Sequence, residues 1–538
     1  MFSKYCSKSR TQQADPQGYR YSSMRITSPR LANYYAKQAG MRTEAIRPRG
    51  CSLIVGRYRC CGARESSVIL KLLSIIISVY RVAESNNVAK IYGTGNHTEA
   101  MGEASARAMV KIDESVNKQI ETDELNPKRH PGIIKSRAMQ LPEWIEKAMV
   151  EATADHPVKP LRKVAGILAN YLKQRHPPLE KHEFVDKLTE VQELVSRKVD
   201  LSKLSNDEID EFWKRNQYNV KIKLKQRVYA WVAVEYDAYK SLCYMLARGA
   251  QEYSVLYQIF NEIHLADKEF QPKALFDFGS GIGTVTWAAS QFWITSLNEY
   301  YCVDSSGDMH RLAESIIANH PSKLKEVYFR QFLPSSARIK SDIVVSAFSL
   351  MELPNAQARL EVVLNLWMRT NNYLIIVEQG TNAGFRIVNE ARDFVLDMSS
   401  KSLETDNPNP FHVFAPCPHD IICPRYIVDK TPCNFQSSYF TVSVGKQSEL
   451  KKERYSYVVL KKGERPADDP QWPRLVRPSL VRSKHTMCRI CTATGKLEEI
   501  VFTASKHGKP LYKCARHSDW GDKLPLQIID PEEPASSD

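Results

Sequence analysis

The sequence predicts an α/β fold built around a doubly wound parallel sheet, with a helical segment before it and a cysteine-rich segment after it. Three observations support this prediction. A glycine-rich turn joins an apolar strand to a helix within residues 274–289, short apolar runs rich in β-branched residues follow, and segments of helical composition separate them. Such runs suit parallel strands that are buried on both faces. Their alternation with helices indicates a doubly wound sheet.

The glycine-rich turn is the most informative stretch of the chain, and it reads Phe276-Asp277-Phe278-Gly279-Ser280-Gly281-Ile282-Gly283. Glycines at this place let the backbone approach a ligand while the next helix begins. The register D-x-G-x-G-x-G resembles the first motif of class I S-adenosylmethionine-dependent methyltransferases. It does not satisfy the G-x-G-x-x-G spacing of dinucleotide-binding proteins. A Rossmann-like domain with a purely structural turn is the alternative.

The strand that follows supports a ligand-binding turn. It is expected over residues 299–304 and ends at an acid, Asp304. Asp304 lies 21 residues after Gly283, which is about the spacing at which an acid meets ribose hydroxyls in such folds. Further strands are expected at 341–348 and 373–378, with helices around 309–321 and 355–370.

Length and composition indicate a soluble globular protein with more than one structural unit. The chain has 538 residues, of which 43% are hydrophobic and 25% charged, and this length exceeds that of one ordinary core. The formal net charge is +14. Residues 1–64 hold 13 lysines and arginines against two acids, so most of this charge belongs to the N-terminus.

The N-terminal segment resembles a mitochondrial presequence, because it is rich in arginine, serine and tyrosine and poor in acids. A disordered basic arm and a mis-joined gene start are the alternatives. The apolar run at 68–79 is shorter than the roughly 20 residues of a bilayer span and contains Lys71. We therefore expect a matrix-targeting extension or a buried helix there, and no membrane anchor.

Residues 100–265 are expected to be helical. The segment from Tyr229 to Ile263 carries aromatic residues at helical spacing, which is typical of a buried helix face. The segment 212–227 places basic residues beside aromatic ones. This pattern suits either contact with RNA or a solvated face, and the sequence leaves both open.

The cysteines give the second strong signal, since six of the 12 lie between residues 417 and 514: Cys417, Cys423, Cys433, Cys488, Cys491 and Cys514. A disulfide scaffold is not expected in a long globular chain without a secretory signal. A zinc ribbon would show two close C-x2-C pairs, and only one is present. Four thiolates at irregular spacings suit an iron–sulfur cube, and zinc remains the alternative.

Several motifs in this order resemble a known family: the glycine-rich turn, the run Glu378–Phe385, the run Ala415–Asp420, and the run Lys506–Arg516 followed by Trp520-Gly521-Asp522. Together they are similar to the methyltransferase-like factors of the mitochondrial small ribosomal subunit, called methyltransferase-like protein 17 in animals. The resemblance covers about residues 140 to 525. It implies a class I methyltransferase domain, a four-cysteine iron–sulfur site and a role in small-subunit assembly, bound to rRNA between head and body.

The resemblance also implies which residues form the sites. Asp277, Gly279, Gly281 and Gly283 fall on the methionine-side and backbone contacts of S-adenosylmethionine, and Asp304 falls on the ribose contact. The cluster ligands would be Cys417, Cys423, Cys433 and, in preference to Cys488, Cys491. The segment 434–438 departs from the family pattern because it lacks the usual basic residue. The chain before residue 100 has no counterpart in the family.

Catalysis is less well supported than cofactor binding. The segment Ser346–Pro354 contains no D/N-P-P-Y/F loop of the kind that amino-methylating enzymes use, and no cysteine for covalent attack. Glu352 is a candidate base, although a lone acid there is more often a cap or solvated. The catalytic residues therefore stay unknown. The stretch 446–489, with 12 basic and five acidic residues, is expected to lie near phosphate.

The expected function is that of a mitochondrial-matrix assembly factor with little or no catalytic activity, and the alternative is an active small-subunit rRNA methyltransferase. Its partners would be the rRNA and proteins of the mitochondrial small ribosomal subunit, without a membrane, and the free protein would be a monomer. The expected segments are a presequence and poorly ordered extension at 1–99, a helical domain at 100–265, the methyltransferase-like Rossmann domain at 266–405, a cysteine-rich iron–sulfur and β extension at 406–525 and a tail at 526–538.

Overall fold

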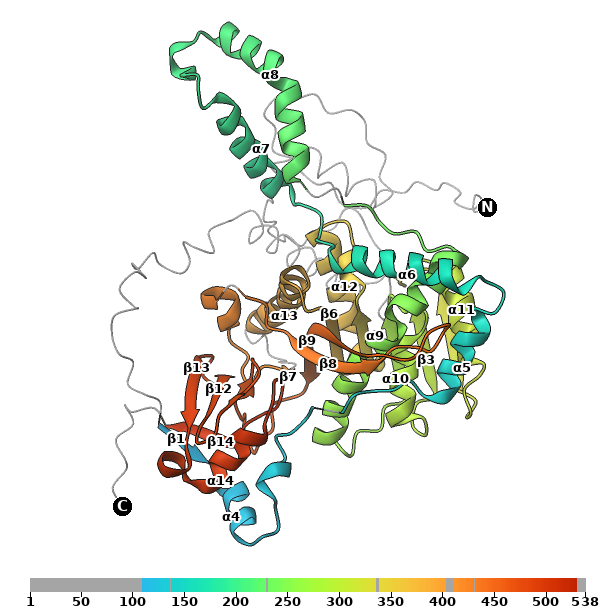
Figure 1. The fold of residues 1–538 in the computed structure, drawn as a ribbon, viewed down its shortest axis with the longest axis vertical. Coiled ribbons are helices and arrows are strands. Elements are labelled where there is room, and N and C mark those ends of the chain that lie inside the picture. The colour runs from blue at the N-terminus through green and yellow to red at the C-terminus, as the bar shows by residue number, and fades with distance from the viewer. Residues whose placement is uncertain are drawn as a thin grey trace, which may run out of the picture. The chain divides into compact units, whose positions relative to one another are not determined.

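A computed structural model of the chain describes residues 109–529, apart from 136, 229–230, 335–337, 403–409 and 430 (Figure 1). These residues belong to one of the two units of the chain, Ala106–Asp538. The predicted presequence and the apolar run at 68–79 lie outside the described residues. Within the described part, none of the helices combines the length and the apolar character that crossing a bilayer requires.

The parallel part of the central sheet contains the strands that the sequence predicts. Its strands follow the order β4-β3-β2-β5-β6 and all pair in parallel: β2 Ala274–Phe278, β3 Glu299–Val303, β4 Glu326–Arg330, β5 Ser341–Ala347 and β6 Thr370–Gln379. The helices between and after them are α10 Thr284–Trp293, α11 Gly307–Ile317, α12 Ala356–Arg369 and α13 Asn382–Ser402. The predicted alternation of strands and helices is confirmed in this region.

The sheet does not stay parallel, which corrects the expectation of a purely parallel sheet. Strand β9 (Leu450–Lys462) pairs antiparallel with β6, and β7 (Phe411–Ala415) pairs antiparallel with β9 at the edge. The first half of β9 also pairs with β8 (Phe435–Phe440). An antiparallel strand inserted beside the last parallel strand gives the mixed sheet of a methyltransferase-like α/β fold.

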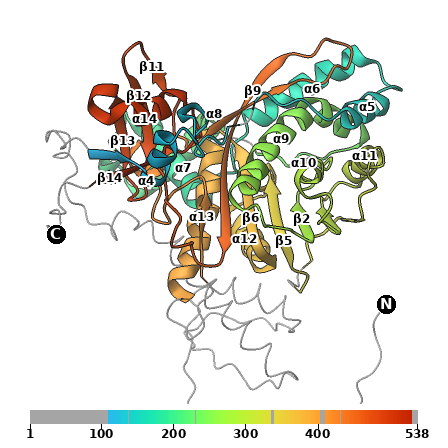
Figure 2. The same cartoon turned by 90° about the horizontal axis from the view of Figure 1, so that it is seen from below.

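Both faces of this sheet are buried, which explains why its strands are continuous apolar runs. Along β6, Ile375 and Val377 contact the core that contains helix α9 (Ala238–Ala266) and α10. The intervening Leu374 and Ile376 contact the opposite core, which contains residues of α12 and α13. Figure 2 shows the helices around the sheet from below. Successive residues of a strand point to opposite faces, so each core receives every second residue.

Within the described part of the chain, five helices precede α9: α4 Glu114–Glu121, α5 Glu143–Ala152, α6 Val158–Lys173, α7 Lys181–Ser196 and α8 Asn206–Arg227, with short 3-10 helices η1 Pro127–Arg129 and η2 Leu201–Lys203. Helix α8 contains the predicted basic and aromatic segment. None of its described residues is buried, and a capping box between Ser205 and Glu208 closes its N-terminus.

The last described part of the chain forms a smaller β structure with one helix. Its elements are β10 Arg474–Leu475, β11 Leu480–Val481, β12 Thr486–Cys491, β13 Leu497–Phe502 and α14 Ala504–His517. They bury a third core that includes Ile490, Phe502 and Leu511. The segment expected to be a tail begins with β14 (Leu526–Ile529), which pairs antiparallel with β1 (Met109–Ile112) and joins the two ends of the described chain.

Candidate functional site

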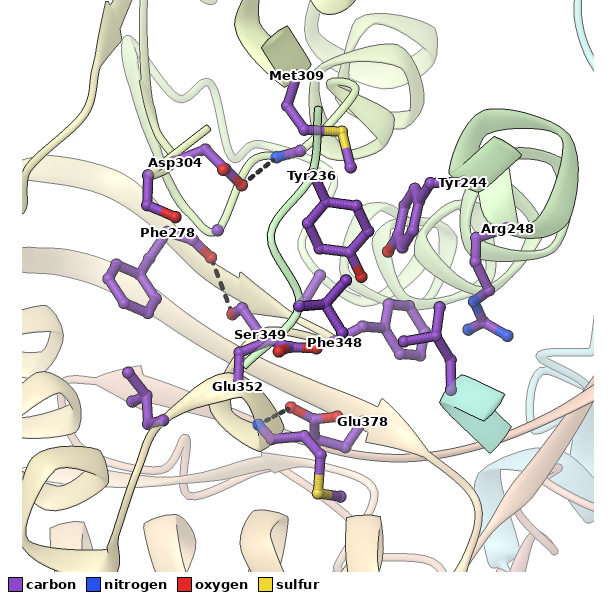
Figure 3. A pocket seen from close by; sticks show the side chains of 18 of the residues that line it. Tyr236, Tyr244, Arg248, Phe278, Asp304, Met309, Phe348, Ser349, Glu352 and Glu378 are labelled. Atoms are coloured by element: carbon purple, nitrogen blue, oxygen red, sulfur yellow. Dashed lines mark hydrogen bonds between the residues drawn. The ribbon is translucent and has the colours of Figure 1, made fainter. Parts of the chain in front are cut away.

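A cavity of about 280 Å³ lies at the carboxyl ends of the parallel strands (Figure 3). The glycine turn after β2 and Asp304 after β3 form one part of its wall, and residues after β5 and β6 form another. Ligands of open α/β sheets bind at this edge, because the loops there diverge at a switch in strand order. The position of the cavity is therefore that of a cofactor site.

The glycine turn has backbone angles that favour glycine. Gly279, Gly281 and Gly283 have φ values of +72°, +50° and +87°. A Cβ atom on Gly279 would lie 2.3 Å from the Cβ of Ser349, so packing requires glycine there. A Cβ on Gly281 would meet no heavy atom closer than the Gly279 carbonyl oxygen at 4.0 Å. Gly281 therefore presents its backbone to open space in the cavity wall.

Asp304 holds the turn and still offers acceptor capacity. Its Oδ2 accepts a hydrogen bond from the Gly281 amide at 2.9 Å, and its Oδ1 accepts one from the Ser306 amide at 2.9 Å. A carboxylate has about four lone-pair positions, so two remain for a ligand hydroxyl. Asp304 is only partly buried and lines the cavity.

The other two residues predicted for this site lie behind the wall. Asp277 is fully buried, and neither carboxyl oxygen has a hydrogen-bond partner among the described residues. Burial raises its pKa well above the usual value, and the nearby Asp304 and Glu252 raise it further. Gly283 begins α10 as its N-cap. The structure thus brings Gly279, Gly281 and Asp304 to the cavity and places Asp277 and Gly283 beneath it.

Opposite the glycine turn, the wall carries buried charges that sequence reasoning missed, except for Glu352. Glu352 forms an ion pair with Arg175, whose side chain is 1% exposed. Arg248 contacts Glu252 at 3.0 Å and Glu453 at 2.9 Å.

Glu378 is the remaining carboxyl group of this wall. Its Oε1 accepts a hydrogen bond from the Met351 amide at 3.2 Å. Burial raises the pKa of Glu378 to about 8, and Glu352 adds to this shift. Glu378 is therefore mostly protonated at neutral pH.

An extended strap, Trp231–Asp237, contributes Ala233, Val234 and Tyr236 to the lining of the cavity. Its Val232 carbonyl accepts a hydrogen bond from Arg175 at 2.9 Å, and its Tyr236 carbonyl accepts one from Ser306 at 2.6 Å. The prediction of a helix from Tyr229 is wrong for this part, because α9 begins only after its N-cap Asp237. Tyr236 contacts Tyr244 in an edge-to-face pair at 5.3 Å, and the two rings pack against the main core while also lining the cavity.

The four cysteines predicted as cluster ligands line one small cavity near β7 and β12. Cys417, Cys423 and Cys433 come from the loop between β7 and β8, and Cys491 ends β12. Burial raises the pKa of the Cys423 thiol to about 11, and the neighbouring Cys417 adds to the shift. Burial likewise raises the pKa of Cys491, and the other three thiols raise it further, which shows how close the four groups lie.

Strand geometry separates Cys491 from Cys488. Residues three apart on a strand point to opposite faces. Cys488 is buried in the third core with Ile490, and its Sγ lies 3.6 Å from Ser479 Oγ and 3.8 Å from the Ala515 carbonyl. Cys491 instead lies on the shared cavity, with its Sγ 3.4 Å from His419 Nε2.

The surroundings of the four thiols suit an anionic group. Arg425 and Arg474 line the same cavity, and Arg392 lies close enough to interact with Cys417 and Cys423. Among the described residues, however, no three His, Cys, Asp or Glu side chains are arranged around one point as ligands of a metal ion. The cavity measures only about 10 Å³, so the thiols would have to turn outward around a cluster.

Comparison with known proteins identifies the family. The sequence model of the family described as mitochondrial small ribosomal subunit Rsm22 matches residues 238–525. The human protein named ribosome assembly protein METTL17, mitochondrial, is 36% identical over 403 residues, which cover 74% of this chain and 86% of the human protein. The chain belongs to the Rsm22 family. The predicted family and the predicted mitochondrial location are thereby confirmed.

More distant similarities accompany this Rsm22-family assignment. Rsm22-cox11 tandem protein 2, mitochondrial, from Schizosaccharomyces pombe is 26% identical over 329 residues, covering 53% of this chain and 43% of that protein. Among solved structures, magnesium protoporphyrin IX methyltransferase from Synechocystis PCC 6803 with bound SAM is 12% identical, with a TM-score of 0.26, covering 48% of this chain and 98% of that chain. A similarity this remote carries no information about function.

Outside both sites, buried His130 gives this Rsm22-family chain a testable response to pH. Its Nε2 lies 2.8 Å from Ser518 Oγ, and burial lowers its pKa from 6.5 to about 4. Because the unfolded chain binds the proton more tightly, the free energy of unfolding should fall as the pH drops from 6.5 toward 4. At pH 5 the loss should be about 2 kcal/mol. Urea midpoints at pH 7 and pH 5 should therefore differ more for wild type than for His130→Asn, and equal differences would contradict the assignment.

Proposed function

We propose that this chain assists the assembly of the mitochondrial small ribosomal subunit as a factor that binds S-adenosylmethionine, an iron–sulfur cluster and small-subunit rRNA, with little or no methyl transfer. The observation that carries the proposal is the combination of family membership with a methyltransferase-like cavity and four convergent cysteines. The human relative is by name a ribosome assembly protein.

The cofactor part of the proposal is supported by the fit of the glycine turn. Gly281 offers an unobstructed backbone surface, and Asp304 offers two free acceptor positions beside it. Gly279, Gly281 and Asp304 would hold S-adenosylmethionine directly, whereas Asp277 and Gly283 would shape the turn. When bound, the cofactor would supply an electrophilic methyl group. The chain's own residues would orient it and exclude water.

Removing the Asp304 carboxylate should weaken cofactor binding. We expect Asp304→Ala to cost roughly 1–3 kcal/mol, because a polar ligand group would be left without its partner. Calorimetric titration of purified protein with S-adenosylmethionine measures this change. Asp308→Ala is the matched control, since Asp308 is an acid in the first turn of the adjacent α11 that does not line the cavity. Equal affinity of wild type and Asp304→Ala would remove Asp304 from the site.

The absence of strong catalysis is supported by the far wall of the cavity. Arg175 holds the strap Trp231–Asp237 against the cavity through the Val232 carbonyl and also engages Glu352. Glu378 is the one lining carboxyl group with a pKa of about 8, and therefore the best candidate for proton transfer.

An active rRNA methyltransferase is the second candidate function, and Glu378 is the observation that favours it. The two functions are distinguished by transfer of a labelled methyl group from S-adenosylmethionine to small-subunit rRNA. Wild type and Gly281→Asp should give the same background, because the proposal assigns no turnover to the site. Incorporation by wild type that Gly281→Asp abolishes would establish the enzyme instead.

The cluster part of the proposal is supported by the donor set. Four thiolates that come from irregular sequence spacings and line one small cavity suit a 4Fe–4S cube, in which each thiolate binds a different iron. Cys417, Cys423, Cys433 and Cys491 would hold the cluster, and Arg392, Arg425 and Arg474 would offset its negative charge. Zinc remains the alternative metal.

A further inference from the structure

Helix α14 carries a positively charged face without a single acid. Its sequence contains Lys506, Lys509, Lys513 and Arg516, and neither aspartate nor glutamate occurs between Ala504 and His517. The three lysines are exposed and Arg516 is partly exposed. These four residues are called the α14 basic face below.

The geometry of the helix places three of these four charges on one side. Gly508 interrupts the helix with φ of 78° and ψ of 154°, and the second part then continues regularly. In that part Lys509, Lys513 and Arg516 recur at spacings of four and three residues, which puts them on one face. Leu511, Cys514 and Ala515 are buried on the opposite face against the third core.

Two neighbouring segments extend the α14 basic face. Helix η1 supplies the exposed Lys128 and Arg129, and it is fixed to the end of α14 by the contact of 2.8 Å between His130 Nε2 and Ser518 Oγ. The turn between β11 and β12 supplies the exposed Arg482 and Lys484, and the Arg482 carbonyl accepts a hydrogen bond from Arg516 at 2.5 Å. Eight cations from three separate parts of the chain thus share one region.

None of these eight cations forms an ion pair with a carboxylate of the described residues. Other cations of the stretch 446–489, which the sequence predicts to lie near phosphate and which includes Arg482 and Lys484, are paired with carboxylates. Lys461 pairs with Asp267, Arg465 with Asp420 and Asp469, Arg474 with Glu262, and Arg489 with Glu499. Much of the positive charge in that stretch is therefore neutralised within the protein, whereas the charge around α14 is not.

We propose that the α14 basic face, flanked by Lys128, Arg129, Arg482 and Lys484, is the surface that binds the phosphate backbone of small-subunit rRNA. This inference rests on the proposed function and names the site of its RNA contact. Cations spread over three elements suit an extended polyanion better than a small anion. Lysines and arginines dominate this surface, and among the described residues of α14 no Phe, Tyr or Trp side chain is exposed, although His517 is, which favours positioning through phosphates over reading of bases.

The test compares two triple variants with equal loss of charge. The first is Lys506→Gln, Lys509→Gln and Lys513→Gln. The second replaces the exposed Lys159, Lys163 and Lys323 by glutamine, and none of these lies on α14 or beside it in the chain. Binding of the full chain to transcribed small-subunit rRNA is measured between about 50 and 200 mM salt. Each lost phosphate contact lowers the slope of log K against log salt by about 0.7, so the first variant should lose about 2 in slope and about tenfold or more in affinity at low salt.

The possible outcomes separate the inference from the proposed function. The inference is supported if the first variant loses slope and affinity, keeps the wild-type melting temperature, and the second variant binds like wild type. Two outcomes would overturn the inference and leave the rRNA role intact, provided that wild type binds the rRNA. In one, both variants lose the same affinity for the rRNA; in the other, the first variant loses none. Wild type that does not bind the rRNA, or binds anionic vesicles in preference to it, overturns the inference and the rRNA part of the proposed function together.

Discussion

Replacing Cys491 by serine is expected to remove the visible colour of anaerobically prepared protein. If Cys417, Cys423, Cys433 and Cys491 hold a 4Fe–4S cluster, each substitution removes one of four required thiolates. Wild type should be brown with broad visible absorbance, and Cys491→Ser should be nearly colourless with little bound iron. Absorbance spectra and iron analysis of the same samples measure this loss.

Cys488→Ser is the matched control, because Cys488 lies three residues away on the same strand and faces the third core. It should keep the colour, as should Cys514→Ser. If Cys491→Ser stays brown and Cys488→Ser is colourless, the fourth ligand is Cys488. If wild type contains zinc and no iron, the site holds zinc and the cluster is contradicted. The cluster joins loops far apart in the sequence, so its loss should also lower the melting temperature.

Removing Arg474 is expected to destabilise the fold by about 3–5 kcal/mol, since a buried carboxylate would lose its partner. Arg474 pairs with Glu262 of α9, and both side chains are only 5% exposed. Tyr457 of β9 closes the network, since its hydroxyl lies 2.6 Å from both Arg474 and Glu262. Although burial opposes it, the pKa of Glu262 lies below its usual value because of Arg474. Urea unfolding of Arg474→Met should show the loss as a lower midpoint.

Two further variants test the cause of this loss. Arg489→Met breaks the ion pair with Glu499, whose side chains are 54% and 45% exposed, and should cost less than about 1 kcal/mol. Arg474→Met combined with Glu262→Met should recover part of the stability of the single variant, because no buried charge is then left unpaired. A single variant as stable as wild type would mean that the network does not hold α9 to β9 and β10.

The parts of the fold that the sequence predicts are those with local signals. The turn Gly279–Gly283 is one example, since its glycines are required by positive φ values within a few residues. The apolar run 374–377 is another, because its four residues are buried alternately on the two faces of the sheet. The insertion of β9 beside β6 has no such signal, because it depends on pairing between residues that are about 80 positions apart.

The same distinction holds for the candidate sites. Arg175 and Glu352 meet across 177 positions, and the strap Trp231–Asp237 is held by carbonyl contacts that the sequence does not reveal. The strap was missed because its aromatic residues continue the helical spacing of α9. The sequence alone can separate Cys488 from Cys491 as the fourth ligand. Alternation along β12 puts Cys488 on the same face as the apolar Ile490 and Cys491 on the other face. The basic face of α14 follows from helical spacing, whereas the lack of ion pairs between its cations and carboxylates of the described residues requires the structure.

The most direct test of the account is the amount of mature small ribosomal subunit in mitochondria that lack this chain, measured by gradient sedimentation of small-subunit rRNA. Cells without the chain should lose most of the mature subunit, and wild type should restore it. Glu378→Gln should restore it equally, because glutamine mimics the protonated carboxyl group but cannot transfer a proton. Normal subunit levels without the chain would contradict the role in assembly, and failure of a stably folded Glu378→Gln would contradict a non-catalytic one.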